Sequence, residues 1–132
     1  MGTNTIRALR ATRSANAIIR EIDRALRKSA QGTTFIQASV LAIVQEYQSK
    51  GVSPQPVTIS PHLELGSQTL TGVLDRLERS GLLKRERDLE DRRAVRLVIP
   101  AGQEERVKEI ARALERAAGP AMEKVLGTPA KA

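Results

Sequence analysis

Residues 70–99 read LTGVLDRLERSGLLKRERDLEDRRAVRLVI, and a change of hydrophobic period inside this stretch decides the fold. Before Gly81 the apolar residues recur at the helical spacing i, i+3, i+4, i+7, at Leu70, Val73, Leu74 and Leu77. Gly81 suits the C-terminal cap of such a helix. After it, residues 82–86 and 94–99 are expected to be two short strands, since apolar and polar side chains alternate in the second of them. The stretch therefore predicts a helix over 67–80 followed by a β-hairpin.

The tip of the predicted hairpin reads RDLEDRRAV at residues 87–95 and carries six charges in its first seven positions. A loop this charged is either a solvated turn or a surface that holds a charged partner. We expect Arg87, Asp88 and Glu90 to do no more than keep the tip soluble. The role of the remaining charges depends on what precedes the hairpin.

A short helix over about 59–65 and a tight turn at Gly66 precede the helix of residues 67–80. In helix-turn-helix modules the second helix enters the major groove of DNA with its N-terminus leading. Short or amide side chains that can reach base edges or phosphates gather at that end, at Ser67, Gln68, Thr69 and Thr71. The alternative is that Ser67 and Thr69 only cap and start an ordinary helix. The basic hairpin immediately downstream favours the DNA-binding interpretation.

The rest of the chain predicts three further helices, over 5–29, 34–49 and 101–118, with Gly119-Pro120 interrupting the last of them. The first helix has an apolar side that requires a core or a partner subunit. Its opposite side is a basic stripe, formed by Arg10, Arg13, Arg20, Arg24 and Arg27. The stripe suits contact with DNA or with acids of a second subunit, but a charge run is more often a solvated face, the interpretation we favour.

The charge of the 132-residue chain is strongly positive and unevenly placed. The formal net charge is +7 and the isoelectric point is near 10.5. Residues 1–30 carry 7 basic and 2 acidic groups, and residues 76–96 carry 8 basic and 5 acidic groups. A localised excess of this kind favours a polyanionic partner.

Composition also excludes several classes of site. The chain has no cysteine and one histidine, which excludes disulfides and thiolate metal sites and argues against a zinc site. We find no nucleophile with a histidine partner, no paired carboxylates in a cleft and no phosphate-binding glycine loop. No apolar run is long enough to span a membrane. We therefore expect a cytoplasmic protein that is not an enzyme and holds no cofactor or metal.

The segment quoted at the outset resembles the core of the MarR family of winged helix-turn-helix transcriptional regulators. The hallmark of that family is a D-x-R wing after an LxxxGLxxR segment. Here the two motifs are matched by Leu77, Gly81, Leu82 and Arg85 and then by Asp91, Arg92 and Arg93. The resemblance is specific over about residues 57–99 and rests on the helix pattern alone in the flanks.

The resemblance implies a mainly α fold with a small β-hairpin (α+β). Residues 1–132 would form a single MarR-like domain. In it, a winged helix-turn-helix core over 34–99 would be flanked by N- and C-terminal dimerisation helices over 5–30 and 101–126. The short C-terminus leaves the geometry of the dimer open.

The resemblance also implies a set of DNA-binding residues, namely Ser67, Gln68, Thr69, Thr71, Arg85, Asp91, Arg92 and Arg93. In this arrangement Arg93, and with it Arg92, enters the minor groove. Asp91 would brace an arginine by a charge-assisted hydrogen bond, so that less entropy is lost on docking. Gly72 departs from the family, which often has a longer polar residue there.

The function implied is that of a homodimeric, sequence-specific regulator, a repressor that binds double-stranded DNA at a palindromic operator. Release by a small-molecule effector is left open. Two alternatives stand beside it. The winged fold could serve as a protein-interaction module, which would bind no duplex, or as a sequence-indifferent, chromatin-like DNA binder, which would bind all duplexes equally at matched salt.

Overall fold

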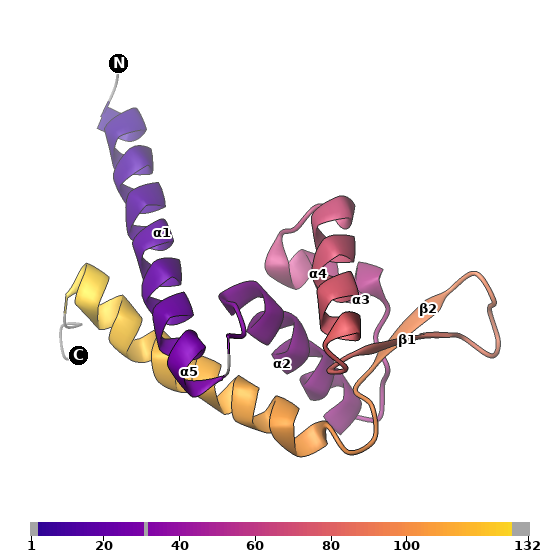
Figure 1. Ribbon diagram of the computed structural model, residues 1–132. Coiled ribbons are helices and arrows are strands. Elements are labelled where there is room, and N and C mark those ends of the chain that lie inside the picture. The colour runs from indigo at the N-terminus through magenta and orange to yellow at the C-terminus, as the bar shows by residue number, and fades with distance from the viewer. Residues whose placement is uncertain (1–2, 31, 128–132) are drawn as a thin grey trace. The chain divides into compact units, whose positions relative to one another are not determined.

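The computed structural model describes residues 3–30 and 32–127 and contains helices with one small sheet (Figure 1). In chain order the elements are α1 (Thr3–Ser29), α2 (Phe35–Ser49), α3 (Pro56–Leu63), α4 (Ser67–Arg79), β1 (Lys84–Arg87), β2 (Val95–Val98) and α5 (Glu104–Leu126). The prediction of a mainly helical fold with a small β-hairpin is confirmed.

The described residues form two compact units. One, the winged unit, is Ile36–Ala111, and the other, the helical unit, comprises the described parts of Met1–Phe35 and Arg112–Ala132. The boundaries thus fall at Phe35 and inside α5, whereas the sequence suggested a core over 34–99. Whether the chain works as one domain stays a prediction.

The winged unit has an aliphatic core to which α4 contributes a full stripe. The predicted residues Leu70, Val73, Leu74 and Leu77 are all buried. Other buried side chains come from α2, α3, the segment after α4 and the start of α5, among them Leu41, Val44, Ile59, Leu82, Leu83, Leu97, Val107 and Ile110. The helical spacing that predicted α4 therefore marks the side of the helix that packs.

The helix α3 begins earlier than its apolar pattern suggested. We expected it over about 59–65, but it begins at Pro56, which fits the first helical position because proline has no N–H to leave unpaired there. The backbone N–H of Gln55 donates to the Thr58 hydroxyl at 3.3 Å. The chain then turns through Glu64, which has a left-handed φ of 52°, and Gly66 to reach α4.

The wing, residues 84–98, is an antiparallel hairpin in which Arg85 pairs with Leu97 and Arg87 with Val95. Its second strand is fixed to the body of the winged unit by backbone contacts. The N–H of Leu97 donates to the carbonyl of the buried Pro54 at 2.7 Å, and just after the strand the N–H of Ile99 donates to the Gln48 side chain at 3.1 Å. The hairpin therefore has an anchored base and a free tip.

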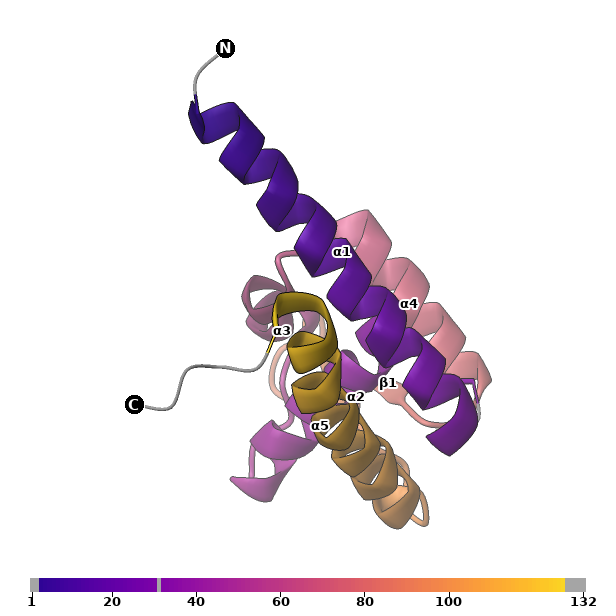
Figure 2. The ribbon, with the colours of Figure 1, turned by 90° about the vertical axis from the view of Figure 1, so that its left-hand side faces the viewer.

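The helical unit pairs α1 with the C-terminal part of α5. Glu21 and Lys124 form an ion pair of 3.0 Å between the two helices. The N-terminal turns of α1 extend past the end of α5 (Figures 1 and 2), and every residue from Asn4 to Arg13 is exposed. This half of α1 has no packing partner within the described part of the chain.

The expected interruption at Gly119-Pro120 is wrong, because α5 continues through Pro120 to Leu126. Proline removes one helical hydrogen bond. Here Gly119 and Pro120 are exposed, so water can satisfy the freed carbonyl, while Ala117 and Ala121 stay buried one turn apart on the packed side. Packing on that side outweighs the lost bond.

Candidate nucleic-acid interface

The N-terminus of α4 presents polar side chains and free backbone amides. Gly66, with extended φ and ψ of −66° and 156°, is the N-cap, and no side chain caps the helix. Ser67 is therefore the first helical residue, and whether it does more than start the helix stays a prediction. The side chains of Ser67, Gln68 and Thr69 are exposed. Helix amides without a cap are donors for an anion, and the helix dipole adds to the attraction.

Thr71 lies one turn further along α4 and is also exposed. Its hydroxyl donates to the carbonyl oxygen of Ser67 at 2.8 Å, which leaves the hydroxyl oxygen able to accept. Gly72 beside it is half-buried, and a Cβ added there would meet nothing within 4 Å. The four residues predicted on α4 thus share its N-terminal turns.

Two aspartates shape the backbone of the wing tip. One Asp88 carboxylate oxygen accepts from the N–H of Glu90 at 2.8 Å, and one Asp91 oxygen accepts from the N–H of Arg93 at 3.0 Å. The same local turn therefore occurs twice, in Asp-Leu-Glu and in Asp-Arg-Arg. Further backbone bonds close the tip, from Asp88 N–H to the Ala94 carbonyl at 3.0 Å and from Ala94 N–H to the Asp91 carbonyl at 2.9 Å.

The prediction that Asp91 braces an arginine side chain is modified by this geometry. Asp91 holds the backbone of Arg93, not a guanidinium group. The side chains of Arg92 and Arg93 are exposed, and neither has an ion pair among the residues that the structure describes. Two cations are therefore presented on a loop whose backbone is already ordered.

The prediction that Asp88 only keeps the tip soluble is wrong. Its side chain is 13 % exposed, and its second oxygen pairs with the Arg96 guanidinium at 3.0 Å. The bonds from the Glu90 amide and from Arg96 hold the pKa of Asp88 below its ordinary value. Asp88 ties the tip to β2, and the Asx spacing to Glu90 was the sequence signal that could have shown it.

Arg85 is occupied within the protein. Its guanidinium group donates to Asp75 and to Glu78, the latter at 3.1 Å, and its backbone N–H donates to Glu78 at 3.1 Å. Glu78 first and Asp75 second raise the pKa of Arg85, and Arg85 lowers the pKa of Glu78. In the structure Arg85 clamps β1 to α4 and so sets the wing relative to α4. A contact of Arg85 with DNA stays a prediction.

A groove of about 370 Å³ lies against the exposed end of α4. Its lining is mostly apolar and consists of Pro56, Val57, Ser60, Ser67, Leu70, Thr71, Leu74, Arg85 and Val95. Ser67 and Thr71 therefore belong both to the groove and to the predicted DNA-contacting surface. A molecule that filled the groove would lie against both side chains.

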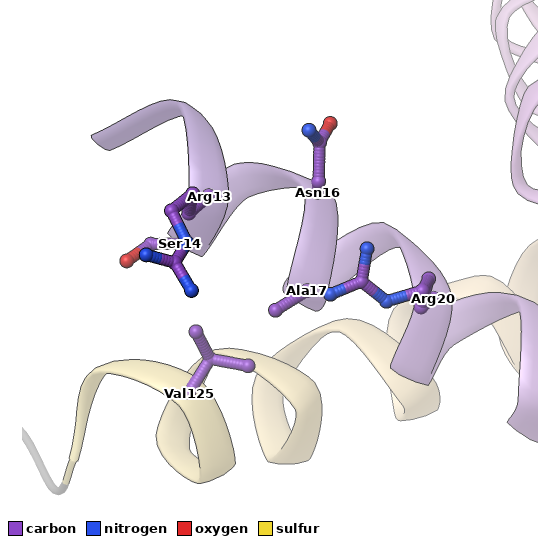
Figure 3. A pocket seen from close by; sticks show the side chains of 6 residues that line it. All are labelled: Arg13, Ser14, Asn16, Ala17, Arg20 and Val125. Atoms are coloured by element: carbon purple, nitrogen blue, oxygen red, sulfur yellow. The ribbon is translucent and has the colours of Figure 1, made fainter. Parts of the chain in front are cut away.

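The helical unit has a second hollow, also of about 370 Å³, lined by Arg13, Ser14, Asn16, Ala17, Arg20 and Val125. Figure 3 shows Arg13 and Arg20 on either side of Ala17, with Val125 of α5 opposite. Neither arginine has an ion pair among the described residues, whereas Arg24 of the same stripe pairs with Glu21 at 2.7 Å. The hollow is thus a cationic surface with an apolar floor.

Within residues 3–30 and 32–127 no group of His, Asp and Glu side chains could hold a metal ion. No helix in the same ranges is long and apolar enough to cross a membrane.

Comparisons with known proteins agree with this geometry. Residues 35–95 match the model of the MarR family. AbfR of Staphylococcus epidermidis, in its reduced form bound to DNA, is 26% identical with a TM-score of 0.71, over 86% of this chain and 77% of that one. BldR from Sulfolobus solfataricus is 23% identical with a TM-score of 0.67, over 92% and 80% of the two chains.

Wild-type MarR from E. coli is 18% identical with a TM-score of 0.67, over 94% of this chain and 84% of that one. No curated protein sequence matches the chain. The family match covers the helix-turn-helix and most of the wing, and the similarity of fold extends into the flanking helices. Residues 35–95 are therefore similar to the MarR family, the family that the sequence motifs resemble, and the fold of the chain is similar to those of AbfR and MarR.

Proposed function

We propose that the protein is a homodimeric regulator that binds double-stranded DNA at a palindromic operator and represses transcription there. One observation carries the proposal. The winged unit presents an uncapped, polar helix end at Ser67 and, on a preordered wing, Arg92 and Arg93, which have no ion pair within the described part of the chain. AbfR, which shares the fold, is seen bound to DNA.

The N-terminus of α4 and the tip of the wing suit different grooves of a DNA duplex. A helix whose N-terminus carries Gln68 and short hydroxyl side chains fits the major groove, where amides and hydroxyls can read base edges. Exposed arginines on a narrow loop fit the adjacent minor groove, whose negative potential is highest where the groove is narrow. The net charge of +7 supports an electrostatic contribution to binding.

The proposal of a homodimer rests on the exposed apolar residues of the helical unit. Large apolar side chains are exposed near the N-terminus of α1 and the C-terminus of α5, at Ile6, Leu9, Met122 and Leu126. Apolar surface of this extent favours association. We expect light scattering to give twice the chain mass of 14.4 kDa, and Leu9→Glu to shift the protein toward one copy. A single-chain mass at DNA-binding concentrations would contradict the dimer.

Release by a small-molecule effector is the remaining part of the proposal, and the groove beside α4 supports it. A ligand there would contact Ser67 and Thr71, and so would compete directly with DNA. The mostly apolar lining of the groove, with one guanidinium group, that of Arg85, suits a small aromatic carboxylate. We expect benzoate, a ligand of this class, to weaken DNA binding and raise the melting temperature. A millimolar titration that changes neither would argue against release by this class of ligand.

The test of DNA recognition compares affinity for a selected duplex with affinity for a random one by fluorescence anisotropy. Gln68→Ala should reduce the preference for the selected sequence, because it removes a base-reading group. Arg93→Ala should weaken binding by about 1–3 kcal/mol if the arginine reads a groove. Lys50→Ala, which removes an exposed charge outside α4 and the wing, serves as the control.

The outcomes of this test separate the alternatives. Equal affinity for selected and random duplexes at matched salt would indicate a sequence-indifferent binder. Absence of binding to any duplex would indicate a protein-interaction module. An unchanged affinity of Arg93→Ala would contradict the role given to the wing while leaving the role of α4 intact.

A further inference from the structure

Leu89, at the tip of the wing, is an apolar side chain almost wholly in solvent. Its residue is 98 % exposed, whereas Val57, another large apolar residue with an unusually open position, is 71 % exposed. Single exposed apolar residues are common and need no explanation in themselves. The position of Leu89 calls for one because the loop around it is closed by hydrogen bonds of Asp88 and Asp91 and carries three exposed arginines.

The backbone of the tip holds Leu89 outward. Leu89 is the central residue of the turn in which Asp88 accepts the Glu90 N–H at 2.8 Å. Asp88 is itself fixed, by the Arg96 guanidinium at 3.0 Å and by its own N–H to the Ala94 carbonyl at 3.0 Å. A side chain presented by an ordered turn loses less conformational entropy on docking than one on a mobile loop.

The charges around Leu89 identify the kind of surface that would bury it. Arg87, Arg92 and Arg93 are exposed in the same tip, and they outnumber its two exposed acids, Glu90 and Asp91. The third acid, Asp88, is paired with Arg96. The matching partner therefore has negative charges on either side of an apolar surface. A base-pair step between two phosphate backbones has this combination, and minor-groove proteins insert leucine and similar side chains between such steps.

We infer that Leu89 is an apolar wedge that enters the minor groove and partly unstacks one base step when the wing docks. The inference rests on the proposed function, because it assumes that the wing meets DNA. The step it fits best is a pyrimidine–purine step, since such steps unstack and bend most readily. Leu89 would then add sequence preference at a position where no hydrogen bond is made to a base.

The test compares Leu89→Ala with Leu89→Met and with the full-length wild-type protein. Leu89→Ala should weaken binding to the selected duplex roughly fivefold to twentyfold, because the removed carbons are no longer buried against the bases. The variant also avoids the cost of unstacking the base step, but this offsets only part of the loss. The slope of log K against log salt should not change, because no phosphate contact is removed. Leu89→Met should bind almost as the wild type does.

A direct readout comes from 2-aminopurine placed at successive steps of the duplex. Binding of the wild type should raise its fluorescence at one step in each half-site, and Leu89→Ala should abolish the rise. Val52→Ala removes a partly exposed apolar side chain outside the wing tip and should change neither the affinity for DNA nor the 2-aminopurine fluorescence. Because Leu89 makes almost no contact with the rest of the fold, its variants should remain folded.

The failure of this inference differs from the failure of the proposed function. If the wild type binds no duplex, the DNA-binding function itself is wrong. If the wild type binds but Leu89→Ala matches it in affinity and in 2-aminopurine fluorescence, the wedge alone is wrong. If Leu89→Ala keeps its affinity for DNA but loses a protein ligand, Leu89 belongs to a protein-docking surface, which also overturns the wedge.

Discussion

Replacing Arg85 by Met separates its two possible roles, as a clamp inside the protein and as a contact to DNA. Met keeps a long unbranched side chain along β1 and removes only the charge and the side-chain donors. The variant loses the guanidinium bonds to Asp75 and Glu78, while the backbone N–H to Glu78 remains. If Arg85 acts as a clamp, the stability of the variant falls and the electrostatics of its DNA binding do not change.

The size of the stability loss follows from the exposure of the three groups. The side chains of Arg85, Asp75 and Glu78 are 28%, 45% and 41% exposed, so each ion pair is screened by water. Pairs of this kind contribute about 0.2–1 kcal/mol each. Removal of the cation also leaves two carboxylates facing each other. We therefore expect a loss of about 1–1.5 kcal/mol, a shift of about 0.5–1 M in the urea midpoint.

The assays are urea denaturation and the salt dependence of DNA binding, each on the wild type and on Arg85→Met. A double-mutant cycle with Glu78→Gln should show a coupling of about 0.5–1 kcal/mol that shrinks in 1 M salt. The slope of log K against log salt should match that of the wild type. An unchanged stability together with a slope reduced by about one would refute the clamp and make Arg85 a phosphate contact.

Three further predictions concern the winged unit. Arg85 holds the pKa of Glu78 below its ordinary 4.5, so the clamp stabilises above that pH and is lost as the pH falls through the folded pKa. The stability difference between wild type and Arg85→Met should thus be constant from about pH 7 to pH 5 and shrink below about pH 4, and a difference that grew on acidification would contradict it. Leu97→Ala, at a fully buried position in β2, should cost about 2–5 kcal/mol in urea denaturation, and a cost below about 1 kcal/mol would mean that the wing is not anchored there. Gly72→Ala should stabilise α4 by about 0.5–1 kcal/mol, because a Cβ there meets nothing within 4 Å, and a lower melting temperature would refute the helical geometry at that position.

The elements that the sequence predicted well are those in which local periodicity and tertiary packing agree. The buried stripe of α4 follows directly from the spacing of Leu70, Val73, Leu74 and Leu77. The hairpin follows from the change of the hydrophobic period to two after Gly81. Once the position of the turn is known, the register of the two strands is fixed as well. Gly66 caps the N-terminus of α4. At the other end the helix stops at Arg79 with Ser80 as its cap, and Gly81, predicted as the cap, follows with a φ of 80°.

The features that escaped prediction depend on contacts between distant residues. Asp75 and Glu78 look like ordinary surface acids of α4, and only the position of β1 shows that both meet Arg85. The anchoring role of Asp88 depends on Arg96, its partner across the hairpin. At Pro120 a local helix breaker was outweighed by burial on the opposite side of α5. The period of a pattern predicts which side packs, but not which charges meet.

The most direct test of sequence-specific recognition by α4 and the wing is selection of bound duplexes from a random pool by the full chain. The proposed function predicts a palindromic consensus with half-sites about one helical turn apart, since a two-fold dimer would place two α4 helices in successive major grooves. The recovered pool should lose its consensus when the selection is repeated with Gln68→Ala and Arg93→Ala combined. A pool without any consensus, or no bound duplex at all, would contradict specific recognition.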